Sequence, residues 1–144
     1  MPDYQFTVSL KVTHPSFNYQ SISQALSLEP SIAHNIGDPR YTRKGHSLGG
    51  YHKETLWSLD LCNGKKLDAG KILFEEFIEQ WNTNLAKHKA FISEIRSSGG
   101  VVEYFVGWFS VDSINMSIAL DPSLLKSTAE LGLSIVLHAY LDEE

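Results

Sequence analysis

The stretch from Asp68 to Gly100 constrains the fold most, because it is the one long helical pattern in the chain. Large apolar residues recur in it at three- and four-residue steps, which places them on one side of a helix: Leu73, Phe74, Phe77, Ile78, Trp81 and Leu85. The other side carries polar residues, namely Glu75, Glu79 and Asn82. We expect the short side chain of Asp68 to cap the start of this helix and Gly99-Gly100 to end it. The rest of the chain must then supply a sheet for the apolar face to cover.

The middle of this helix contains a run of poor helix formers, Asn82-Thr83-Asn84. We expect a bend or a break at this run. Beyond it, Phe91, Ile92 and Ile95 would carry the second half of the helix onto the core. The pattern leaves open whether residues 68–100 form one helix or two.

Strands are indicated by alternating apolar and polar residues and by runs of β-branched and aromatic residues. They are expected at 4–13, 31–37, 56–62, 101–109, 114–120 and 133–141. The last of these carries apolar residues on both faces, which predicts an interior position in the sheet.

Two short helices complete the predicted elements. The first starts at Asn18 or Ser21 and stops before Pro30, and the second is capped by Asp121 and ends at Gly132. With 144 residues the chain fits one domain. We therefore predict a single α+β domain over residues 1–144. Its mixed, mainly antiparallel sheet of about five or six strands is covered on one face by the long helix and the two short ones.

The charge of the chain is uneven. The net charge is −5, and the residues from Glu103 onward alone sum to −6, because Lys126 is their only base. One interpretation is a solvated surface, and the other is an acidic face that steers a basic protein partner. On the second interpretation the candidate partner-binding residues are Asp112, Asp121, Glu130, Asp142, Glu143 and Glu144. Either way, direct binding to nucleic acid is disfavoured, because a phosphate backbone would be repelled.

The segment from Asp38 to Thr55 is the irregular part of the chain. Loops of this length are unusual in compact domains and are either functional or mobile. The segment carries residues that could contact a partner or converge on an anionic small molecule: Arg40, Tyr41, Arg43, Lys44, His46, Tyr51 and His52.

No catalytic signature stands out. Cys62 is the only cysteine, so an intramolecular disulfide is excluded, and we expect a small core residue rather than a nucleophile. His46 and His52 share a loop without carboxylates at matching spacing, so neither a metal nor another cofactor is expected. The N-terminus shows no signal peptide, and no apolar run reaches the roughly 20 residues of a membrane span. A cytoplasmic protein is the expectation.

Short groups of residues along nearly the whole chain resemble a bacterial domain-of-unknown-function family of small cytoplasmic proteins. They are Leu26-Ser27-Leu28-Glu29-Pro30, Lys44-Gly45, Trp57-Ser58-Leu59, Leu131-Gly132-Leu133-Ser134-Ile135 and Tyr140. In place of the serine-rich residues that often follow the tryptophan strand, this chain has Asp60-Leu61-Cys62. The resemblance implies a single α+β domain related to, or found among, the immunity proteins of bacterial toxin systems, with no catalytic residues to carry over.

Two functions follow as expectations. The first is a non-enzymatic binding protein, an immunity protein that occludes the active site of a toxin; a basic toxin nuclease domain would suit the acidic C-terminal segment. The second is a small ligand-binding domain or enzyme with an anion-accepting site under the 38–55 loop. A deep pocket beneath that loop would favour the second. The sequence does not indicate an oligomeric state.

Overall fold

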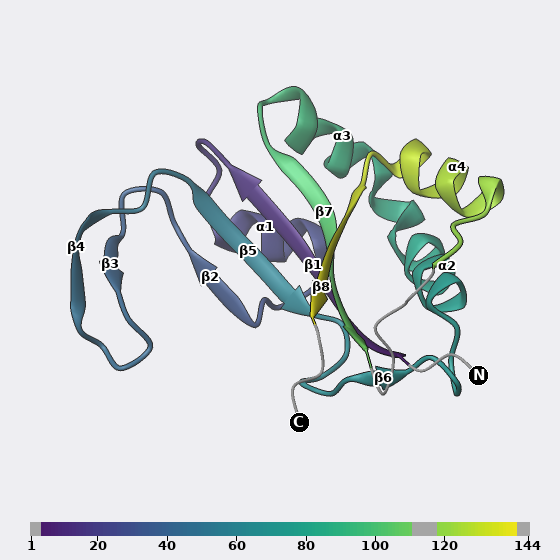
Figure 1. Ribbon diagram of the computed structural model, residues 1–144. Coiled ribbons are helices and arrows are strands. Elements are labelled where there is room, and N and C mark those ends of the chain that lie inside the picture. The colour runs from purple at the N-terminus through teal and green to yellow at the C-terminus, as the bar shows by residue number, and fades with distance from the viewer. Residues whose placement is uncertain (1–3, 111–117, 141–144) are drawn as a thin grey trace.

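A computed structural model gives the structure of the protein, and it describes residues 4–110 and 118–140 (Figure 1). The strands are β1 Tyr4–His14, β2 Ile32–His34, β3 Pro39–Tyr41, β4 Ser47–Tyr51, β5 Thr55–Asp60, β6 Leu67–Asp68, β7 Val101–Ser110 and β8 Ser134–Tyr140. The helices are α1 Tyr19–Leu26, α2 Phe74–Leu85, α3 Lys89–Ser97 and α4 Pro122–Leu131, with a 3₁₀ turn η1 Ala86–His88 between α2 and α3. None of the described helices is both long and apolar enough to cross a lipid bilayer.

In the described residues the main sheet has six strands and is mixed, mainly antiparallel, as predicted. Its order is β2-β5-β1-β7-β8, with β6 paired to the start of β1, and among these described strands only the β7–β8 pair is parallel. The predicted interior position of the last strand is wrong, because β8 lies at the end of the order of described strands and is largely exposed. The strand expected at 114–120 lies mostly outside the described residues, and residues 118–120 form no strand.

The core lies on the helix side of the sheet. Alternate residues of the two central strands β1 and β7 are buried there: Phe6, Val8, Leu10, Val12, Val102, Tyr104, Val106 and Trp108. The ring of Phe6 meets the rings of Phe74 and Phe77 edge-on, with centroids 5.5 and 5.8 Å apart. Helices α2, α3 and α4 lie together at the β7–β8 side of the sheet (Figure 1), and α1 packs near β5. The predicted helical cover is confirmed.

The long helical stretch starts later than predicted. Helix α2 begins at Phe74, and Asp68 is not its cap. The segment Leu67–Asp68 pairs instead with β1, and the Asp68 carboxylate accepts a hydrogen bond from the Gly70 amide at 2.9 Å. Leu73, expected on the apolar face, is 45% exposed at the helix start. The sheet therefore takes the residue predicted to cap the helix, and residues 69–73 form a turn instead of the first helical turn.

The break also falls later than the predicted run Asn82-Thr83-Asn84. Helix α2 continues through this run to Leu85, and the 3₁₀ turn follows at Ala86–His88. The second half, α3, buries Ile92 and Ile95 as expected. Tertiary contacts of Asn82 offset the weak helix propensity of the run.

Asn82 was predicted to face solvent, and this is wrong: its side chain is 5% exposed. It lies four residues after Ile78 and so continues the buried stripe of α2. Its amide nitrogen donates to Ser127 Oγ and Thr128 Oγ1, each at 3.0 Å, and its oxygen accepts from the Tyr104 hydroxyl at 2.8 Å. One side chain thus joins α2, α4 and β7.

We predict that Asn82→Ala lowers the free energy of unfolding by about 2–3 kcal/mol, because the Tyr104 hydroxyl would be left buried without a partner. Asn84→Ala on the exposed side of the same helix is the matched control and should cost less than about 0.5 kcal/mol. Urea unfolding of both variants measures the difference. Equal effects would contradict a role for the buried amide.

A second prediction concerns pH. Burial raises the pKa of Tyr104 far above its ordinary value, so the folded protein keeps the phenol proton where the unfolded chain loses it. Stability should therefore fall as pH rises above about 10, by up to about 1.4 kcal/mol per pH unit from this group. Unfolding of the wild type and Tyr104→Phe between pH 8 and about 11 checks this. The variant should lose less stability over that interval, and parallel curves would refute the assignment.

Candidate functional site

The segment predicted as an irregular loop is a β-hairpin. Strands β3 and β4 form a two-stranded sheet of their own, and residues Pro39–Tyr51 are here called the arm. The arm extends away from the main sheet, beyond β2 and β5 (Figure 1). The Thr42 amide donates to the His46 carbonyl at 2.8 Å, which closes its turn. Polar residues and glycines replace the alternating pattern, because neither face of the arm is buried.

Every residue of the arm is exposed. This includes large side chains, with Tyr41 59%, Leu48 54% and Tyr51 67% exposed. The base of the arm is nevertheless fixed by two backbone hydrogen bonds of 2.9 Å, from Gly37 to the His52 carbonyl and from His52 to the Asp38 carbonyl. The arm is therefore anchored at the sheet while its surface remains open.

The arm is also cationic. It carries Arg40, Arg43 and Lys44 and no acidic residue, so the rest of the chain has a net charge of −8 against −5 for the whole. None of these three side chains forms an ion pair with another residue in the described part of the chain. Their charges remain available to a ligand or a partner.

A hollow of about 350 Å³ lies at the base of the arm, and we call it the basal hollow. It is lined by His34, Arg40, Tyr51, His52, Lys53 and Glu54. The rings of His34 and His52 stack with centroids 3.4 Å apart. Burial and the neighbouring His52 lower the pKa of His34, while the Glu54 backbone and the carboxylates of Asp38 and Glu54 oppose this shift. The hollow thus combines two cationic groups and the carboxylate of Glu54 with a pair of imidazoles.

The predicted loop residues divide into two groups. Arg40, Tyr51 and His52 line the basal hollow, whereas Tyr41, Arg43, Lys44 and His46 lie elsewhere on the arm. The sequence reasoning missed the other lining residues, His34, Lys53 and Glu54. A signal existed for Lys53, which follows His52 directly, but only the pairing of β2 with β5 places His34 beside the arm.

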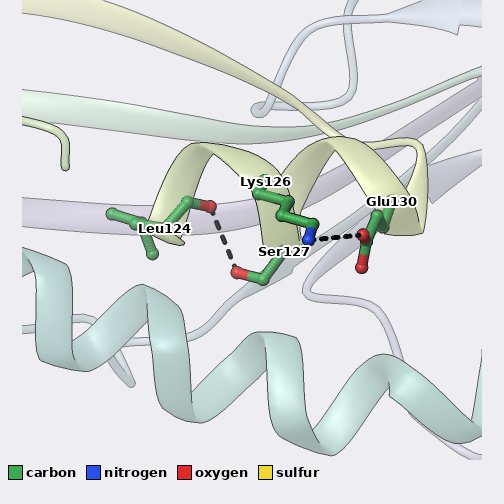
Figure 2. Close-up of polar contacts among 4 residues, drawn as sticks. All are labelled: Leu124, Lys126, Ser127 and Glu130. Carbon is green, nitrogen blue, oxygen red and sulfur yellow. Dashed lines mark hydrogen bonds and ion pairs between the residues drawn. The ribbon is translucent and has the colours of Figure 1, made fainter. Parts of the chain in front are cut away.

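A second hollow, of about 430 Å³, lies between α2 and α4. Its lining includes Glu79, Asn82, Lys89, Ser127 and Glu130. Figure 2 shows two polar contacts within α4, whose Ser127 and Glu130 line this hollow: Ser127 Oγ donates to the Leu124 carbonyl at 3.1 Å, and Lys126 Nζ lies 3.9 Å from Glu130. The amide of Asn82 is likewise bonded, so this groove is explained by helix packing.

The acidic residues predicted to bind a partner do not gather on the described surface. Asp121 caps α4, where its carboxylate accepts from the Leu124 amide at 2.9 Å and from Ser123 Oγ at 2.8 Å. These bonds lower the pKa of Asp121. Glu130 lies at the opposite end of the same helix. The remaining four lie outside the described residues: Asp112, Asp142, Glu143 and Glu144.

Cys62 is buried in the core, as expected. Its sulfur accepts a hydrogen bond from the Val8 amide at 3.3 Å, and burial raises the pKa of the thiol. The sulfur is therefore held as a protonated thiol that is a poor nucleophile. Across the described ranges, histidine, cysteine and acidic side chains nowhere gather in a group of three or more that could hold a metal ion.

A protein-family model described as "Domain of unknown function (DUF4279)" matches residues 4–142. No curated protein and no solved structure matches the chain significantly. The matched range includes the main sheet, all four described helices and the arm.

We predict that deletion of Ser47 to Gly50, which removes most of β4, changes the free energy of unfolding by less than about 0.5 kcal/mol. No residue of the arm belongs to the core, and the entropic cost of closing a loop changes only slowly with the length of the loop. Thermal and urea unfolding measure this. A loss above about 1 kcal/mol would show that the arm supports the main sheet.

Proposed function

This chain belongs to the DUF4279 family of domains of unknown function, and we propose that it is a non-enzymatic protein-binding module that contacts its partner through the arm. One observation carries the proposal: an anchored hairpin presents Tyr41, Leu48 and Tyr51 to solvent without cover from any described element.

Two physical arguments support a protein partner. Tyrosine and arginine are enriched among the residues that carry binding energy at protein interfaces, and the arm combines both. A two-stranded hairpin is at best marginally stable when it packs on nothing, so covering one of its faces would also stabilise the arm itself. A partner surface would supply the burial that this chain does not provide.

The charge of the arm favours an acidic contact surface on the partner. A basic toxin nuclease would instead match the acidic C-terminal segment, but α4 separates Asp121 from Glu130, and each has a local bond within that helix. We therefore place the contact on the arm. The immunity role implied by the resemblance remains part of the proposal, with the arm entering or covering the active site of a toxin.

Site-specific photo-crosslinking in cell extract tests the proposal. A benzophenone amino acid replaces Leu48 on the arm or, as the matched control, Glu94 on the exposed side of α3. We expect one defined protein to be captured from position 48 and not from position 94. Capture of the same proteins from both positions, or none from position 48, would contradict the proposal.

With the captured partner, affinity can be measured directly. Tyr41→Ala should weaken binding about 10- to 30-fold, as expected for an exposed aromatic anchor. Leu125→Ala removes a large exposed side chain from α4 and should leave the dissociation constant within about twofold. Calorimetric or surface-based titration of both variants decides whether the arm or another face makes the contact.

A further inference from the structure

The basal hollow is a built feature rather than a gap beside a loop. Its walls come from β2, from the two ends of the arm and from residues 52–54. The backbone bonds at Gly37 and His52 hold these walls together, and the Ile36 amide donates to Thr55 Oγ1 at 3.0 Å on the sheet side. The backbone that carries its lining side chains is therefore held in place before any ligand arrives.

Two cationic side chains that can bind an anion, Arg40 and Lys53, line the hollow, and neither forms an ion pair within the described part of the chain. Two carboxylates lie near His34 and equal these cations in number. Glu54 lines the hollow, and the Oδ2 atom of Asp38 accepts a hydrogen bond from the Asn35 backbone amide at 2.8 Å. A planar guanidinium can donate two parallel hydrogen bonds to one oxyanion, which a carboxylate or a phosphate group accepts.

The stacked imidazoles should make anion binding at the hollow depend on pH. The rings of His34 and His52 stack with centroids 3.4 Å apart, and burial together with this neighbour disfavours the protonated form of His34 while the hollow is empty of anions. An anion placed against the rings would favour the protonated form. Binding of an anion and uptake of a proton by His34 should then favour one another.

We infer that the basal hollow is a binding site for a phosphomonoester, and that His34, stacked on His52, takes up a proton as the anion enters. A phosphate group offers more charge and more acceptor oxygens than a carboxylate to the four donor groups of Arg40, Lys53, His34 and His52. The volume of about 350 Å³ exceeds the need of a bare phosphate and reaches the range of small-molecule sites. The ester group would lie against Tyr51. This site does not require the arm to bind a protein.

Isothermal titration with phenyl phosphate tests the site. Arg40→Gln should weaken binding about tenfold or more, because a charge-assisted hydrogen-bonding group is lost. Arg43→Gln removes the same charge from the same arm outside the hollow, and it should change affinity by less than about twofold. Equal losses in the two variants would overturn the site in favour of diffuse attraction to a cationic arm.

Four further ligands define its chemistry. Phenol should bind far more weakly than phenyl phosphate, and acetate more weakly than inorganic phosphate. Comparable binding of phenol would overturn the anion site, and comparable binding of acetate would overturn the phosphate assignment.

Sulfate keeps its charge across the titration range of histidine, so its affinity should rise as pH falls from 7.5 to 6, and His34→Gln should flatten this rise. A sulfate affinity indifferent to pH would overturn the coupling to the histidine pair.

Discussion

The side-chain amide of Asn82 can donate two hydrogen bonds through its nitrogen and accept through its oxygen, and this side chain is 5% exposed. Its three partners come from β7 and α4, so all of its bonds form only when α2, α4 and the sheet hold one relative position. Apolar contact alone would tolerate sliding of α4 along α2. An orphaned polar group costs about 1–3 kcal/mol, which makes the displaced arrangements unfavourable. The placement of the helical layer therefore depends on this network.

Elements with strong local signals could be predicted from the sequence. The alternation in β1, the aromatic run in β7 and the Asp121-Pro122 start of α4 each encode their structure within a few residues. Predictions failed where a distant segment competes for the same residues. Asp68 belongs to a strand because β1 offers a pairing edge. Asn82 is buried by hydrogen-bond partners that lie 22 to 46 residues away in the sequence, so no local pattern predicts its burial.

The candidate sites also combine features that a local sequence pattern predicts with features that depend on distant segments. A cluster of basic and aromatic residues identified the arm as a surface of interest, yet it could not show which of them converge. The stack of His34 on His52 arises from the β2–β5 pairing and from the return of the chain at the base of the arm, neither of which leaves a local pattern. Conversely, acidic residues close in sequence are separated in space by the length of α4. Counting charges along a chain does not locate a charged face.

The separation of the arm from the core has an evolutionary consequence. A residue that packs in the core can change only when its neighbours change with it, so its history is tied to the survival of the fold. Arm residues such as Tyr41 and Leu48 are not constrained by packing in this way, since their replacement leaves the hydrophobic core intact. Selection can therefore change the proposed recognition surface one residue at a time on an unchanged scaffold. A lineage of such domains could acquire new specificities without passing through unfolded intermediates.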